Sequence, residues 1–228
     1  RFFIQHYFSL SDNGIYAVAA RFGAIMQIVG AIIFQAWQEM ALRQYNSPDR
    51  DKFFSEMVNL FIMFMSIAAL CFAFGLKIVY PFIVSPEYVV GIVYVFPIIA
   101  SSVLYALSNI LEVGYQCSFE TGRALLGVGV SAAVNILLNF VLIQTIGIYG
   151  VVVTSVVTYA VLLGFRIHDS RRYFKINISK MSILTVAIGA VGVFPFYFTD
   201  SALVDVVMIM IGLAAMTLVA PRVLRSLR

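Results

Sequence analysis

Long apolar segments are the feature that most constrains this chain. Seven follow one another with short connections, at residues 14–38, 54–83, 88–115, 123–145, 148–165, 181–199 and 202–220. Each is close to the ~20 residues that a helix needs to cross a bilayer. Because backbone groups in hydrocarbon must bond to one another, such runs are helices or strands of a closed barrel. The runs are continuous rather than alternating, which excludes a barrel. We therefore expect an all-α, polytopic membrane protein with seven transmembrane helices.

Composition supports the same conclusion. Hydrophobic residues make up 62% of the 228 residues and charged residues only 11%, whereas a soluble domain has about 25% charged residues. The net charge of +4 then belongs to loops at a membrane surface. We therefore expect no nucleic-acid partner.

Basic residues are divided unevenly between the two sides of the membrane. Twelve fall on one side: Arg43, Arg50, Lys52, Arg123, Arg166, Arg171, Arg172, Lys175, Lys180, Arg222, Arg225 and Arg228. Only Arg1 and Lys77 fall on the other. Because short cytoplasmic loops are rich in Lys and Arg, the basic side and the C-terminus are predicted to be cytoplasmic and residues 1–13 periplasmic.

The expected organisation has five parts. They are the end of a truncated helix with an outside loop at 1–13, five transmembrane helices at 14–165, a basic cytoplasmic loop at 166–180, two additional transmembrane helices at 181–220, and a basic cytoplasmic tail at 221–228. Because the chain opens with Arg1 and apolar residues, we expect a piece of a longer polytopic protein. The basic and aromatic segment 165–180 predicts contact with anionic lipids, although ordinary positive-inside loop chemistry explains it equally well.

A permanent positive charge lies inside the first apolar segment. As a helix, Gly14 to Trp37 spans about 36 Å, and the hydrocarbon core is about 30 Å thick. A guanidinium keeps its charge, so Arg21 needs water, an acidic partner or an anionic ligand. One side of the helix carries Gly14, Ala17, Arg21, Ala24, Ile28, Gln35 and Glu39; the other carries Val18, Phe22, Met26, Val29 and Ile33, which suit lipid. We interpret Arg21 as lining a polar cavity for a negatively charged substrate. The alternative is snorkelling to the nearer membrane surface.

Polar stripes mark three further helices. They are Ser101, Tyr105, Ser108, Asn109 and Glu112; Gly127, Ser131, Asn135 and Asn139; and Gly150, Thr154 and Thr158. Small and hydroxyl residues at this spacing favour close helix packing. Asn135 and Asn139 are candidate substrate contacts, although we favour hydrogen bonding between helices for both. Glu112 is interpreted as a solvated helix end.

Catalytic and metal-binding patterns are missing from the sequence. His6 and His168 are predicted on opposite sides of the membrane, so they cannot share a metal ion. No phosphate-binding glycine loop, nucleophile elbow or zinc-protease motif occurs. We expect no enzyme activity, no cofactor and no metal, and a transporter is the more plausible class for many helices with an intramembrane arginine.

Several short motifs resemble one transporter family. They are Arg1-Phe2-Phe3-Ile4, Gly14-Ile15-Tyr16 with Ala17, Ala20 and Arg21, Phe34-Gln35-Ala36-Trp37, Asn135-Ile136-Leu137-Leu138-Asn139, and Gly147-Ile148-Tyr149-Gly150-Val151. Their order and spacing resemble the middle and later part of Wzx-type polysaccharide flippases, over about residues 1–175. Gln38 departs from the proline expected there in many relatives.

The resemblance implies a member of the multidrug/oligosaccharidyl-lipid/polysaccharide exporter superfamily. Such proteins have two six-helix lobes around a central cavity, often with two extra C-terminal helices. This chain would be the C-terminal lobe, and the missing N-terminal lobe would be its partner. The family moves undecaprenyl-pyrophosphate-linked sugar repeat units across the bacterial inner membrane for O-antigen or capsule synthesis. Arg21 would meet the diphosphate and Gln35 the sugar or the other lobe, by alternating access. A polysaccharide polymerase complex is a further candidate partner.

Three other functions remain open at this stage. A drug or metabolite exporter of the same superfamily would share the fold, although Arg21 disfavours cationic cargo. An O-antigen polymerase or ligase would need a large outside loop with catalytic residues, and this sequence has none. A scaffold in a polysaccharide assembly complex would not need Arg21.

Overall fold

The structure, a computed structural model, describes residues 10–226, with side chains for residues 11–217. Over that range every regular element is a helix. The elements are α2 (Leu10–Gln44), α3 (Arg50–Ile83), the 3-10 helix η1 (Pro86–Gly91), α4 (Ile92–Ser118), α5 (Thr121–Ile146), α6 (Ile148–Ser170), α7 (Lys180–Val191), α8 (Val193–Phe198) and α9 (Ala202–Ser226). The all-α prediction is therefore confirmed for the described residues.

Six of the described helical segments are long and apolar enough to cross a membrane. They match the first six predicted segments, with ends shifted by a few residues. α2 begins at Leu10, four residues before the expected start, and α6 continues to Ser170, five residues past the expected end. In the last segment, the described apolar stretch Ala202–Thr217 is shorter, so the count of seven stays a prediction.

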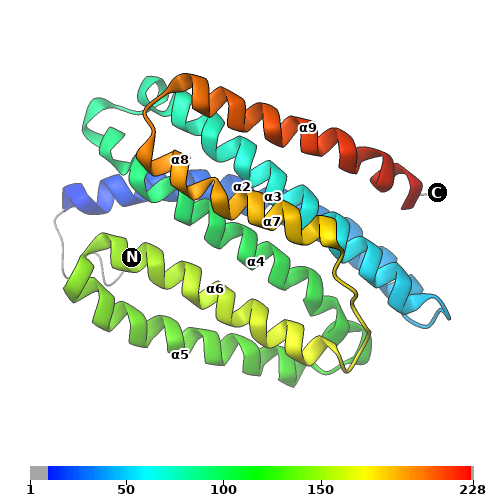
Figure 1. Cartoon of the computed structure of the whole chain (residues 1–228). Helices are drawn as coiled ribbons and strands as arrows, with labels where there is room; N and C mark the ends of the chain where they lie inside the picture. The colour runs from blue at the N-terminus through cyan, green and yellow to red at the C-terminus, as the bar shows by residue number, and fades with distance from the viewer. Residues whose placement is uncertain (1–9, 227–228) are drawn as a thin grey trace.

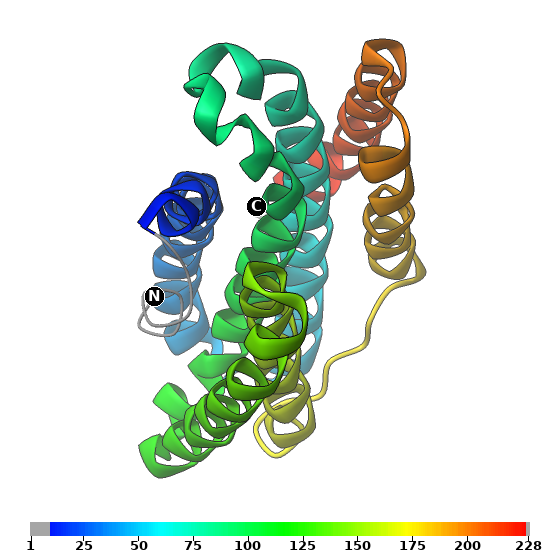
Figure 2. The same ribbon diagram turned by 90° about the vertical axis from the view of Figure 1, so that its left-hand side faces the viewer.

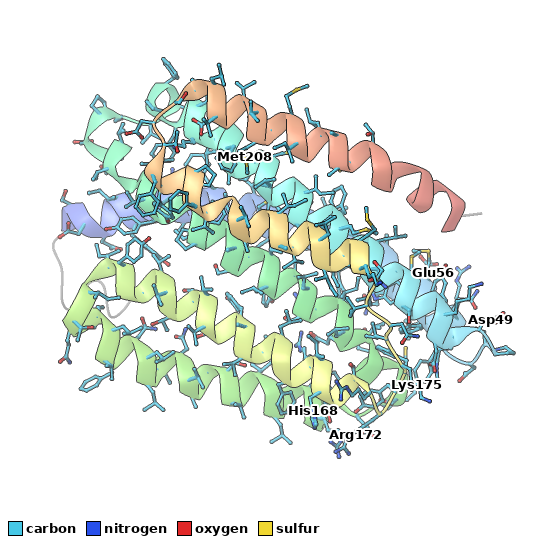
Figure 3. The ribbon with its side chains drawn as sticks, viewed as in Figure 1. Asp49, Glu56, His168, Arg172, Lys175 and Met208 are labelled. Carbon is cyan, nitrogen blue, oxygen red and sulfur yellow. The ribbon has the colours of Figure 1, made fainter. Side chains whose placement is uncertain are left out.

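The helices run back and forth between two ends of the bundle (Figure 1). The connections at 45–49, 119–120 and 171–179 lie at one end, together with the end of α9. This end carries the basic loops, and Figure 3 shows Asp49, Arg172 and Lys175 there. We call it the basic end. The alternation agrees with the predicted clustering of basic residues on one side.

α4 lies at the centre of the bundle. It packs against α2 on one side and α6 on the other, while α5 covers α6 and both α7 and α9 pack on α3. Figure 2 shows α2 and the α7–α9 group on opposite sides of the bundle. The main core includes Phe54, Phe74, Tyr80, Val95 and Tyr115, which are 0–1% exposed.

A break in the sixth apolar segment follows from its proline. α7 ends at Val191 and α8 begins at Val193, so the interruption lies three to four residues before Pro195. A proline ring clashes with the carbonyl four residues earlier, which explains this place. Pro97, in contrast, lies within a continuous α4.

The connection between α6 and α7, residues 171–179, is held along α3; we call it the strap. Asn59 of α3 donates from Nδ2 to the Asn177 carbonyl (2.7 Å) and accepts at Oδ1 from the Ser179 N–H (2.7 Å). The Ser182 hydroxyl also donates to this oxygen (2.6 Å). Ser55 Oγ accepts from the Asn177 N–H (3.1 Å). These bonds fix an otherwise irregular segment against the core.

Candidate functional site

One side of α2 is not covered by the rest of the described chain. Arg21, Ala24, Ile28, Gln35 and Glu39 are all exposed there; we call this set the α2 open face. It is the side on which the sequence placed Arg21. Arg21 makes no ion pair or hydrogen bond among the described residues, so its charge is available to a ligand, to water or to another chain segment.

The bulky side of α2 faces the protein, so its prediction as a lipid-facing side is wrong. Met26 is 3% exposed, and Phe22, Val29 and Ile33 pack against the main core. The close approach comes from glycines on this side. A Cβ at Gly30 would lie 2.7 Å from the Ala106 Cβ of α4, closer than packed carbon atoms allow.

Further along α2, Trp37 fixes the helix to α4. Its indole is 2% exposed, and its Nε1 donates to the Ile110 carbonyl (3.1 Å). Gln38 Nε2 donates to Gln116 Oε1 of α4 (2.7 Å). These bonds hold one side of α2 against α4 and thereby set the direction of the α2 open face.

The two predicted substrate contacts on α2 are far apart along the helix. Arg21 and Gln35 share the open face but are fourteen residues apart, about 21 Å at 1.5 Å per residue. No hydrogen bond joins either to Asn135 or Asn139 among the described residues. A single small ligand could not contact both α2 side chains, whereas an elongated one could.

Asn135 and Asn139 lie at the contact between α5 and α6. Asn135 Nδ2 donates to Thr158 Oγ1 of α6 (2.9 Å), which is a bond between helices. Asn139, 5% exposed, donates from Nδ2 to the Asn135 carbonyl and to Asn135 Oδ1, both at 3.0 Å. Asn139 Oδ1 and, on α6, Thr154 Oγ1 are both buried without a hydrogen-bond partner among the described residues. This geometry agrees with the packing interpretation for Asn135, while Asn139 bonds within its own helix.

Sequence analysis missed a buried charge on α6. Arg166, assigned to the cytoplasmic loop, lies inside α6 and is 3% exposed. Its Nη2 lies 2.9 Å from Glu112 Oε2 of α4, and its Nη1 donates to Asn109 Oδ1 (3.0 Å) and Ser108 Oγ (3.3 Å). Glu112 is therefore an ion-pair partner of Arg166 and only partly solvated, with 33% of its side chain exposed. The polar stripe on α4 was the available signal, but it did not indicate which helix faces it.

A second charged group surrounds Asp169, at the end of α6. Asp169 is 4% exposed, and its Oδ1 lies 3.1 Å from both Arg123 Nη1 and Arg172 Nε. On the strap, Tyr173 Oη donates to Glu120 Oε2 (2.8 Å). Burial, reinforced by this bond, raises the pKa of Tyr173 to about 12. These contacts join α5, α6 and the strap at the basic end.

At the other end, Lys77 of α3 joins the last two helices to the bundle. Its Nζ donates to the carbonyls of Phe196 (2.8 Å) and Thr199 (2.5 Å). It also lies 3.6 Å from Asp205 Oδ1, an ion-pair distance too long for a hydrogen bond. Lys77 was predicted only as an outside loop charge, but it has a clear structural role.

Potential metal ligands are dispersed over the described part of the chain. No group of three or more His, Cys, Asp or Glu side chains there could hold a metal ion. The two cysteines, Cys71 and Cys117, are both free. The functional candidate is the α2 open face with its exposed cation, Arg21.

Comparison with known proteins gives no further assignment. No protein-family model, curated protein or solved structure matches this chain.

Proposed function

We propose that this chain belongs to a flippase that moves undecaprenyl-pyrophosphate-linked oligosaccharide units across the bacterial inner membrane. The proposal rests on the exposure of Arg21 and on its lack of a described partner. Arg21 is an exposed cation without a described partner on a membrane-length apolar helix. An arginine in such a place is costly unless something compensates it, and a diphosphate suits a guanidinium because two charge-assisted hydrogen bonds form at once.

The shape of the α2 open face also suits an elongated lipid-linked substrate. Ala17, Ala20 and Ala24 lie within one turn of Arg21, and the exposed Ile25 and Ile28 add apolar surface on the same face. Gln35 lies about 21 Å further along the same face. In the proposal the diphosphate binds at Arg21 and a sugar, or the opposite lobe, contacts Gln35. Asn135 and Asn139 are not needed as direct ligands, because their donors are already used in helix contacts.

The resemblance to Wzx-type proteins supplies the rest of the mechanism. It implies a preceding lobe that closes the other side of the cavity and rocks against this one. A MATE-like drug exporter is the alternative, and the unpaired positive charge argues against a cationic drug as cargo.

The test is complementation of a flippase-null bacterium with the full-length gene carrying Arg21→Lys, Arg21→Gln or Arg21→Ala. Surface polysaccharide is measured at matched membrane protein levels. Losing a charge-assisted bond of about 1.5–3 kcal/mol predicts a reduction of about tenfold or more for Gln and Ala, with Lys retaining activity. Lys52→Gln is the matched control, because Lys52 is an exposed cation of α3 that makes no ion pair or hydrogen bond among the described residues.

Two outcomes would overturn parts of the proposal. Full activity of Arg21→Ala would show that the arginine only snorkels to the membrane surface. Failure of the wild-type gene to restore polysaccharide, with the protein present in the membrane, would favour the drug exporter.

A further inference from the structure

An apolar groove lies beneath the strap. The strap runs on the side of the bundle away from α2 (Figure 2). Its walls come from three helices and include Val58 and Ile62 of α3, Leu107 of α4, and Leu163 and Ile167 of α6. The strap contributes Ile176 and Ile178. The groove has a volume of about 190 Å³. We call it the strap groove.

The groove is open at an apolar mouth and carries a charge at its edge. Ile167 and Ile178 are 47% and 49% exposed, so hydrocarbon can reach the groove. Arg171, the first residue of the strap, lines the same groove. Arg171 is exposed and forms no ion pair with any described carboxylate. The site thus combines an apolar slot with an uncompensated cation, which are the two features that bind an amphipathic anion.

The depth of Arg171 fits a lipid phosphate. α6 has 23 residues, about 35 Å at 1.5 Å per residue, and the hydrocarbon core is about 30 Å thick. A helix of this length that spans the core would place the residue directly after it at the headgroup level.

The surrounding charge favours an anionic lipid over a neutral one. Residues 166–180 contain five basic residues and one acidic residue. Arg166 and Arg172 are paired with Glu112 and Asp169. The other three, Arg171, Lys175 and Lys180, have no ion pair among the described residues, and all three are exposed.

We propose that the strap groove binds one acyl chain of an anionic phospholipid, whose phosphate contacts Arg171. The hydrogen bonds from Asn59 and Ser55 hold the strap in place, so the groove is preformed and little ordering is needed when the lipid binds. The proposal concerns the face away from α2 and does not depend on the transported substrate.

The test measures lipid binding to the purified full-length protein. Phosphatidylglycerol and phosphatidylcholine are titrated separately, and bound lipid is counted by native mass spectrometry. Wild-type protein is expected to bind phosphatidylglycerol more tightly. Arg171→Gln should weaken phosphatidylglycerol binding about fivefold, since one basic residue at the surface contributes about 1 kcal/mol.

Two further variants separate this site from general surface attraction. Arg172→Gln removes the same charge from the next residue, but that side chain faces Asp169 (3.1 Å), so near-wild-type binding is expected. Ile178→Trp, at an exposed position, should obstruct the groove and weaken binding of both lipids. Equal losses for Arg171→Gln and Arg172→Gln, unchanged binding to Ile178→Trp, or displacement of the lipid by inorganic phosphate alone would each overturn the proposal.

Discussion

A single side chain, Asn59 of α3, makes several of the hydrogen bonds that hold the strap, so replacing it tests how the strap packs against α3. Replacing Asn59 with Ala removes two bonds to the strap, those to the Asn177 carbonyl and the Ser179 N–H, and a third to the Ser182 hydroxyl in the first turn of α7, directly after the strap. At about 1 kcal/mol net for each bond, the opening free energy of the strap falls by about 3 kcal/mol. The open population should then rise about 100-fold.

Limited trypsin digestion reports this opening, because Arg171, Arg172 and Lys175 lie in the strap. Where opening is fast compared with cleavage, the cleavage rate follows the open population. Mass spectrometry of fragments ending at these residues should show about 100-fold faster cleavage in Asn59→Ala. Ser55→Ala should give at least about fivefold, because the Ser55 hydroxyl accepts from the Asn177 N–H (3.1 Å) and also donates to the Lys175 carbonyl (3.2 Å).

Asn46→Ala is the matched control, since Asn46 is exposed in the connection between α2 and α3. Cleavage of Asn59→Ala at the wild-type rate would refute the reasoning, because the strap would then be held by something other than these bonds. An equal increase in Asn46→Ala would show that the effect is a general loss of stability.

Two further predictions concern the charged groups at the basic end. Glu112→Leu leaves Arg166 buried without its ion partner, which costs about 3–5 kcal/mol of stability, so the melting temperature in detergent should fall by about 10 °C. Adding Arg166→Leu to this variant should restore most of the melting temperature. If the two single losses simply added in the double variant, that result would contradict the pairing. Burial and the bond to Glu120 raise the pKa of Tyr173 to about 12 in the folded protein, against about 10 in the unfolded chain. The stability that the neutral Tyr173 contributes is therefore complete below pH 10 and lost as the pH rises through 12. Tyr173→Phe should flatten this part of the stability-against-pH curve, and an unchanged slope would contradict it.

Hydropathy alone predicted most of the helices, because each apolar run is long, continuous and bounded by polar residues. It could not tell which side of α2 faces protein. Lipid chains and protein interiors are equally apolar, so Phe22, Met26 and Val29 suit either environment. The informative residues were Gly23 and Gly30, seven residues apart on the side that approaches α4. Their meaning depends on knowing that α4 is the neighbour.

The candidate site was predictable only in part, for a related reason. The sequence identified Arg21 because a charge inside an apolar run needs a partner. The same argument applied to Arg166 would have predicted a partner too, but the residue lies near the end of its apolar run and was counted as a loop charge. The hydrogen-bond and ion-pair partners of Arg166, Asn109 and Glu112, are more than fifty residues away along the chain. Only the pairing of α4 with α6 brings them together.

The three cations within apolar helices therefore have different consequences when removed. Arg166 and Lys77 are bonded by this chain's own oxygen atoms, so their loss leaves buried acceptors or a buried carboxylate unpaired and should lower stability. Arg21 has no such partner among the described residues, so its removal leaves nothing unpaired within this part of the fold. A variant at Arg21 that loses transport while keeping its melting temperature would thus assign the charge to a ligand, whereas parallel losses of both would place its partner in another part of the protein.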